Sequence, residues 1–279
     1  LSKDVSVAGL TVNASASDGD VVLGGKTITV GDGDVTINSS IAANLTFSGT
    51  KTADRTVTLN DTLVGDLNFT GNLTESTDTD AFRHSLISSS DTAFVVGSII
   101  VGLDADLEFA LGHTLPLYLT GSITNSGFVS STDSSSIIFG GYEGSFASST
   151  ITPGLSTSNA FPGIIVDKGS ESVTIADDIT IAATNDDSAL VVRSGSLTIT
   201  DPLNGNGSAI FTGDTAKVSI HNGAALTVAG LRFNSTNTDA QASLNGLGFS
   251  NLTLNFSGND DGKLSVVDTT TFTGTLRII

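Results

Sequence analysis

Cysteine, methionine and tryptophan are all absent from this chain of 279 residues, and tyrosine occurs only twice. Without cysteine the chain cannot form disulfide bonds, thiolate nucleophiles or cysteine-ligated zinc sites. Without tryptophan it lacks the core residue that is usual in immunoglobulin-like sandwiches. Aromatic platforms for binding sugars are scarce for the same reason. Regular packing of aliphatic residues is therefore expected to supply most of the stability.

Basic residues are few, with 11 Lys and Arg against 29 Asp and Glu, and the formal net charge is −18. Binding to nucleic acid or to anionic membrane surfaces needs clustered Lys and Arg, so we expect neither partner. The longest apolar run, at about residues 93–103, is too short to span a bilayer, so no membrane span is predicted. No signal peptide is visible at Leu1, and we expect that one has been removed from an exported precursor.

Helical periodicity is also lacking, because no segment longer than about eight residues has an apolar stripe at helical spacing. The chain instead repeats a tripeptide in which Thr stands between two large apolar residues. Alternation with a period of two places the apolar pair on one side of a strand and Thr on the other. Gly, Asn, Asp and Ser, which favour turns, separate the copies. The tripeptide occurs at residues 10–12, 28–30, 35–37, 45–47, 57–59, 173–175, 179–181, 197–199, 226–228 and 252–254.

The pattern predicts an all-β protein, and a right-handed parallel β-helix (a β-solenoid) fits it best. Short strands with Val, Ile, Leu and Phe on one side and Gly, Asn and Asp at the corners are typical of stacked coils. Coils of roughly 20–25 residues would give a rod about 55 Å long. The alternative is a series of tandem β-sandwich domains, and a closed barrel would need longer, evenly matched strands.

We expect residues 1–279 to form a single elongated β-rich domain. Residues 122–163 are rich in Ser, Thr and Gly and contain Pro153 and Pro162, half of the four prolines. This stretch is predicted to be irregular and loop-rich, with a linker between two domains as the alternative.

Two strand–turn segments carry a family resemblance. Residues 194–200 read Ser-Gly-Ser-Leu-Thr-Ile-Thr, and residues 222–230 read Asn-Gly-Ala-Ala-Leu-Thr-Val-Ala-Gly. They resemble the strand–turn units of bacterial autotransporter passengers and of filamentous-haemagglutinin-type adhesins. The resemblance covers about residues 5–71 and 164–279. It implies a secreted right-handed β-helix that is displayed at a cell surface.

Closely spaced carboxylates form the most metal-like pattern in the chain. Asp18 and Asp20 flank one glycine, and Asp32 and Asp34 flank another. Carboxylates on a turn can supply the hard oxygen ligands that Ca²⁺ prefers, so these four residues are the candidate calcium ligands. Solvated turn residues explain the same pattern. No other cofactor is expected.

Sequons for N-glycosylation are frequent, with about twice the number that chance would place among 18 Asn residues. Asn can carry glycan at such positions in an exported protein. The alternative is that Asn before an apolar residue and Thr simply begins many of these strands. The candidates are Asn13, Asn38, Asn44, Asn60, Asn68, Asn72, Asn206, Asn234, Asn251 and Asn255.

Catalytic signatures are missing from the sequence. His84, His113 and His221 are far apart, and no nucleophile elbow, zinc-binding helix or P-loop is present. We therefore predict that the protein is not an enzyme. The alternative is a β-helical protein that binds or cleaves polysaccharide, as tail spikes and lyases do, and Asp178 and Asp187 are the carboxylates to test.

The predicted function is that of an extracellular or cell-surface structural or adhesive protein. Strand-like segments at residues 5–10 and 272–279 could add to the sheet of another copy, so self-association through strand edges is expected. A glycan or a host-surface receptor is a further expected partner.

Overall fold

The computed structural model describes the strands and many of the turns between them, and every structural statement below concerns these residues. They are 5–12, 21–31, 34–37, 41–47, 55–59, 67–69, 83–87, 94–103, 105–110, 117–131, 136–140, 147–154, 158–182, 188–201, 203, 205–212, 215–221, 223–228, 230–233, 241–245, 252–255, 263–267 and 276–278. They contain strands and turns and no helix.

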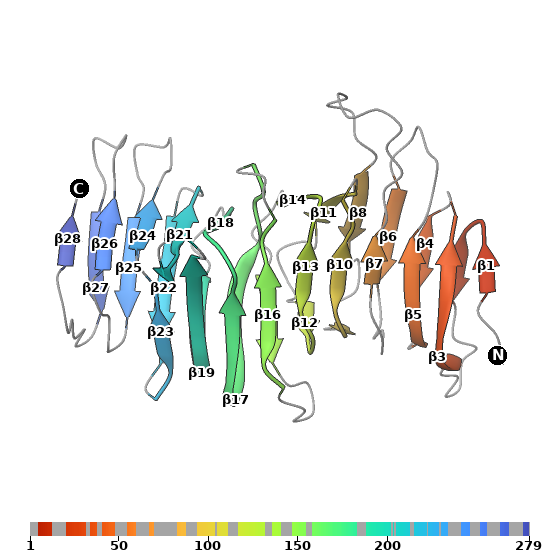
Figure 1. The fold of residues 1–279 in the computed structure, drawn as a ribbon, viewed down its shortest axis with the longest axis horizontal. Coiled ribbons are helices and arrows are strands. Elements are labelled where there is room, and N and C mark those ends of the chain that lie inside the picture. Colours follow the sequence, from red (N-terminus) through yellow and green to blue (C-terminus); the bar gives the residue numbers. More distant parts are fainter. Residues whose placement is uncertain are drawn as a thin grey trace.

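Successive strands stack along the long axis of the molecule in the order of the sequence, from β1 at one end to β28 at the other (Figure 1). All pairings between strands are parallel within the described residues, apart from a short antiparallel pair of β19 and β20 (Gly205–Asn206). The chain passes around three faces in turn, and one circuit is called a coil here. Equivalent residues of adjacent coils pair in register and lie 24 residues apart at Ile99–Ile123, Ile151–Ile175 and Ile175–Ile199.

The first face is a continuous parallel ladder that runs through most of the molecule. Its inward residues are apolar at nearly every coil, and its outward residues are mostly Thr and Ser. It is formed by β1 (Val5–Val7), β3 (Val21–Val30), β5 (Ile41–Phe47), β7 (Leu67–Phe69), β10 (Ile99–Val101), β13 (Ile123–Asn125), β16 (Ser149–Thr152), the ends of β17 (Gly163–Ile175) and β19 (Ser188–Asp201), and β23 (Ala225–Thr227).

The second face belongs to the same 17-stranded sheet as the first. The long strands β17 and β19 continue around the corner between the two faces, with shifts of register at the corner itself. The second face contains β9 (Phe94–Val96), β12 (Leu117–Leu119), β15 (Ser136–Gly140), the beginnings of β17 and β19, β22 (Thr215–Ile220), β25 (Gln241–Asn245) and β27 (Lys263–Val267).

The third face consists of two parallel sheets that meet in the middle of the molecule. Residues 160 and 161 join them, because the Ala160 N–H donates to the Val129 carbonyl at 2.8 Å and Phe161 pairs with Ile181. The strands are β2 (Leu10–Val12), β4 (Val35–Ile37), β6 (Arg55–Leu59), β8 (Arg83–Ile87), β11 (Asp106–Ala110) and β14 (Phe128–Ser131), followed by β18 (Ile179–Ile181), β21 (Ser208–Phe211), β24 (Gly230–Phe233), β26 (Leu252–Asn255) and β28 (Leu276–Ile278).

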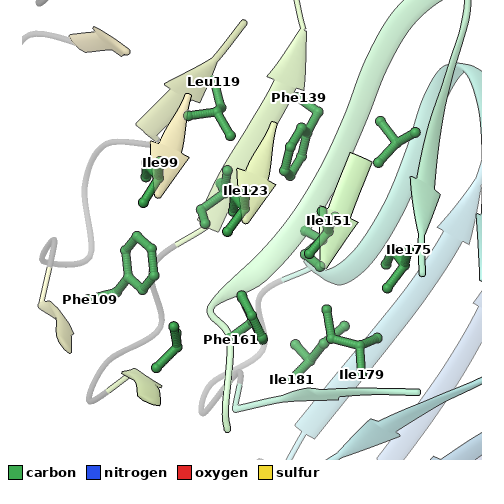
Figure 2. Packing of buried hydrophobic residues seen from close by; sticks show 14 of the residues in the cluster. Ile99, Phe109, Leu119, Ile123, Phe139, Ile151, Phe161, Ile175, Ile179 and Ile181 are labelled. Atoms are coloured by element: carbon green, nitrogen blue, oxygen red, sulfur yellow. The ribbon is translucent and has the colours of Figure 1, made fainter. Parts of the chain in front are cut away.

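The core fills the space enclosed by the three faces. Ile99, Ile123, Ile151 and Ile175 stack from coil to coil on the first face and point toward residues of the third face such as Phe161 (Figure 2). All five side chains are buried. Burying an aliphatic or aromatic side chain of this size contributes about 1.5–3 kcal/mol. The same contact is repeated at each coil, so the core is a long column rather than a central cluster.

Residues 122–163 contain the short strands β13, β14, β15 and β16, and each of them pairs in parallel with strands of neighbouring coils. Polar residues replace apolar ones inside the coils here. Buried Asn125 and Asn159 both donate from Nδ2 to the Pro153 carbonyl at 2.8 Å.

The Oδ1 atoms of these two side chains accept from the backbone. Asn125 accepts from the Gly127 N–H at 3.0 Å, and Asn159 accepts from the Val129 N–H at 2.9 Å. Side-chain amides thus satisfy backbone groups where the chain departs from regular stacking. This satisfaction is what makes a buried Asn acceptable.

The fold is a parallel β-solenoid, as the sequence predicts, and the tandem-sandwich alternative is wrong. A sandwich is built from antiparallel pairs, whereas these ladders are parallel and continue across the middle of the chain. Within the described residues no helix is long and apolar enough to cross a membrane.

Candidate functional site

The four candidate calcium ligands are only partly placed. Asp34 is exposed at the start of β4, and its backbone carbonyl accepts from the Leu10 N–H at 3.2 Å. Asp18, Asp20 and Asp32 lie outside the described residues. Among the described residues no group of three or more His, Cys, Asp or Glu side chains is arranged to hold a metal ion. Calcium binding stays a prediction.

Four of the ten sequon residues lie in strands. They are Asn44 in β5, Asn68 in β7, Asn206 in β20 and Asn255 in β26. Asn68 occupies a first-face position in register with Thr46 and Ile100. Asn13, Asn38, Asn60, Asn72, Asn234 and Asn251 lie outside the described residues, and glycosylation stays a prediction.

Asp178, one of the two carboxylates named for the enzyme alternative, caps the backbone of the next coil. Its Oδ1 accepts from the Ser208 N–H at 2.7 Å, at the start of β21. The preceding Asp177 accepts from the Asp178 N–H at 2.8 Å. Asp187 lies outside the described residues. The placed carboxylate therefore has a role in joining one coil to the next.

The histidines are not brought together by the part of the fold that is described. His84 lies in β8 on the third face, and exposed His221 follows β22 on the second face. The backbone of His221 continues the ladder, since its N–H donates to the Val192 carbonyl at 2.9 Å. His113 lies outside the described residues.

The outward side of the first face carries the most regular polar arrangement in the molecule. Every outward residue from β16 to β23 is Ser, Thr or Ala, and we call this set the hydroxyl face. Its three columns follow the register of the coils. The residues are Ser148, Thr150 and Thr152, then Ser172, Thr174 and Ala176, then Ser196, Thr198 and Thr200, and finally Ala225 and Thr227.

All of these residues are exposed or half-buried. The central column consists of Thr150, Thr174, Thr198 and Thr227, and their hydroxyls make no hydrogen bond within the described residues. At one border of the face the Ser172 hydroxyl donates to the Ser148 hydroxyl at 3.2 Å, and the Ser148 hydroxyl donates to the Glu171 carboxylate at 3.0 Å. At the other border the Thr200 hydroxyl donates to the Ile175 carbonyl at 3.1 Å. The central column therefore presents the unengaged donors and acceptors of the face, at the spacing of the coils, about 4.8 Å.

The corner beside the hydroxyl face holds a buried lysine, Lys168, in the middle of β17. Its Nζ donates to the Ala147 carbonyl at 2.8 Å and to the Thr120 carbonyl at 3.2 Å, on the two preceding coils. Burial lowers the pKa of the Lys168 ammonium, and the neighbouring Glu171 carboxylate opposes this shift. The ammonium thus joins three successive coils through backbone carbonyls.

A second network crosses the same corner between β17 and β19. The Ser194 hydroxyl donates to the Asp167 carboxylate at 2.7 Å and accepts from the Gly169 N–H at 2.8 Å. Gly169 has a φ of 64° and Gly195 a φ of 78°, a conformation that glycine adopts without strain. The corner is therefore a hydrogen-bonded joint that fixes the angle between the first and second faces.

Sequence reasoning missed both the hydroxyl face and the corner. A signal for the face exists, because Ser-x-Thr-Ile-x recurs at residues 148, 172 and 196 with a spacing of 24 residues. The corner has no comparable signal, since the partners of Lys168 are carbonyl groups, which every residue type provides.

No protein-family model, curated protein or solved structure matches the chain significantly.

Proposed function

We propose that the protein is an extracellular or cell-surface β-solenoid with a structural or adhesive function that associates with further copies of itself. Bacterial autotransporter passengers and filamentous-haemagglutinin-type adhesins, which its strand–turn segments resemble, are the functional class to which we assign it. The observation that carries the proposal is the stack of coils that the described residues form from β1 to β28 (Figure 1).

A stack of this kind is suited to a spacer or a display surface. Each coil contacts only its neighbours, so length is gained without a larger core. The three faces repeat equivalent outward positions from coil to coil along the axis, and a repeated surface suits contact with other repeated surfaces. The net charge of −18 keeps single molecules apart and soluble except where contact is favourable.

Electron microscopy combined with light scattering over a range of concentrations tests the proposal. We expect single rods at low concentration and larger assemblies as the concentration rises. Rods that stay monomeric throughout contradict the self-association.

Depolymerisation of neutral or acidic polysaccharides separates the scaffold from the enzyme alternative. We expect none. If the protein cleaves a polysaccharide and Asp178→Asn abolishes the cleavage without unfolding the chain, the enzyme reading replaces the structural one.

A further inference from the structure

We propose that the hydroxyl face is a lateral docking surface for the hydroxyl face of a second copy of this chain. The inference rests on the proposed self-association and names the surface that makes the contact. It places the contact along the side of the rod, whereas association through strand edges would place it at the ends.

The charge distribution selects this face. Two copies that each carry a net charge of −18 repel one another, and a contact that brings carboxylates together is the least favourable. From β16 to β23 the outward positions of the first face carry no charged side chain. Charged residues lie at the corners, as Asp167 and Glu171 do, or on other faces, as Glu108 does on the third. The Glu171 carboxylate reaches one border of the hydroxyl face, where its Oε2 accepts from the Ser148 hydroxyl at 3.0 Å. The central Thr column carries no charge, so two copies can approach along this column without opposing like charges.

The chemistry of the face is complementary to itself. A hydroxyl group both donates and accepts, so a Thr column can pair with an identical column of a partner. A face of carboxylates or of ammonium groups could not. The hydroxyls of Thr150, Thr174 and Thr198 are not engaged within the described residues, and such pairing would satisfy them. Ser and Ala lose little or no side-chain entropy on being buried, and β-branched Thr is already restricted at χ1.

The period and size of the face suit a repeated contact of modest strength. Both copies have the same coil spacing, so a match at one coil is repeated at the next, and Thr methyl groups can fit between the columns of the partner. The first face continues over β13, which presents Thr124, and over β10, which presents the exposed apolar Ile100, so that the contact surface spans six coils. Its dimensions are about 29 by 17 Å, or roughly 500 Å² per copy. Such an area is at the lower end of specific interfaces, so we expect weak pairing that becomes effective when many copies are held close together.

Thr174→Lys tests the contact, because Thr174 lies in the central column between Thr150 and Thr198. The matched control is Thr180→Lys, at the half-buried outward position of β18 on the third face. Both variants lower the net negative charge by one unit, so overall repulsion changes equally. We expect Thr174→Lys to weaken self-association by roughly tenfold or more, measured by sedimentation, because the interface would bury opposed ammonium groups. Thr180→Lys should associate as well as the parent or slightly better, and thermal melts should confirm that both variants fold.

A second measurement uses the absence of cysteine from the chain. In Thr174→Cys the new thiol is the only one, so oxidative cross-linking reports directly on contact between two copies. We expect a covalent dimer from Thr174→Cys and little from Thr180→Cys.

The outcomes separate this inference from the proposal beneath it. A parent that never associates overturns both. A parent that associates while Thr174→Lys and Thr180→Lys behave alike overturns the lateral contact only, and loss of assembly in Thr275→Pro would then locate the contact at the strand edge. Equal cross-linking of the two cysteine variants, or binding of the face to a polysaccharide or to ice in place of a second copy, also overturns it.

Discussion

The outward sides of the first and second faces differ sharply, although β17 and β19 contribute to both. On the first face these strands present Thr174 and Thr198, which are half-buried. On the second face they present Ile165 and Val191, which pack with Ile138 and are only 6% and 4% exposed. The inward sides of both faces are apolar in the same way. Within one continuous sheet, the part on the first face thus has an outward side that is half exposed to solvent, whereas the part on the second face is buried on both sides.

The residue pattern of a strand distinguishes a face whose outward side is covered from a face whose outward side is open to solvent. Three consecutive buried apolar residues, as in Ile164–Val166 and Leu190–Val192, indicate a strand with both sides shielded from water. Strict alternation with Thr, as in residues 173–175 and 197–199, indicates a strand with one free side.

Charge introduced on the two faces should give the largest contrast. Ile165→Asp places a carboxylate in a shielded apolar cluster and should destabilise the protein by about 3 kcal/mol or more. Thr174→Asp places the same group on the half-solvated side and should cost about 1 kcal/mol or less, since β-propensity is its main loss. Urea unfolding measures both, with Ile199→Asp in the core as the benchmark for a severe loss. Equal costs for Ile165→Asp and Thr174→Asp would mean that the second face is open in solution.

The glycines at the corner between the two faces should give the next largest effect. A Cβ on Gly195 would lie 2.3 Å from the Glu171 carbonyl oxygen, and φ is 78°. A Cβ on Gly223 would meet nothing within 4 Å, although φ is 85°. Gly223→Ala should therefore lower the free energy of unfolding only by the strain of a non-glycine residue at positive φ, about 1 kcal/mol.

Gly195→Ala should cost clearly more, because the backbone must also shift. Thermal unfolding of the two variants provides the comparison. If they melt together, the corner is able to relax and does not fix the angle between the faces.

Lys168, in the same corner, should make the free energy of unfolding change with pH in the alkaline range. Burial holds its pKa below the ordinary value of a lysine, so between these two values the unfolded chain binds more protons than the folded one. Stability from this group is therefore lowest below the folded pKa, rises as the pH passes through it, and levels off above the unfolded pKa. The unfolding free energy of the parent minus that of Lys168→Met should increase over this range. A constant difference would show that the ammonium is not desolvated.

The smallest effect is expected for Thr198→Ser on the hydroxyl face. The hydroxyl is kept and only one outward methyl group is removed, so the cost should be under about 0.5 kcal/mol. Urea titration checks this value. A loss comparable with that of Ile165→Asp would show that the Thr198 methyl group is buried, and the two faces would no longer differ.

Much of the fold follows from local pattern. Alternation correctly places Leu197 and Ile199 inward and Thr198 outward, because a strand has a period of two whatever it pairs with. Parallel stacking is favoured by this pattern but not dictated by it, because short strands joined by tight turns can also pair as antiparallel hairpins, which is why the tandem-sandwich alternative stayed open.

The buried polar residues could not be predicted in this way. Asn125 and Lys168 donate to carbonyl groups on other coils, and Asn159 accepts from the Val129 N–H, 30 residues earlier in the chain. No local pattern encodes that proximity. The candidate calcium and glycan sites depend on turn residues, and turns favour Asp, Asn and Gly for conformational reasons that hide any chemical role.

The direction of the hydrogen bonds has a mechanical consequence. In every ladder the bonds between coils run along the long axis of the rod (Figure 1). When the two ends are pulled apart, the force therefore breaks the hydrogen bonds between one pair of adjacent coils at a time. It does not load the bonds between all coils simultaneously in shear. Each coil of 24 residues, as between Ile151 and Ile175, would release about 80 Å of extended chain when it detaches. A tethered molecule would yield under tension in steps of this size, so that it absorbs mechanical work by lengthening instead of breaking its attachment.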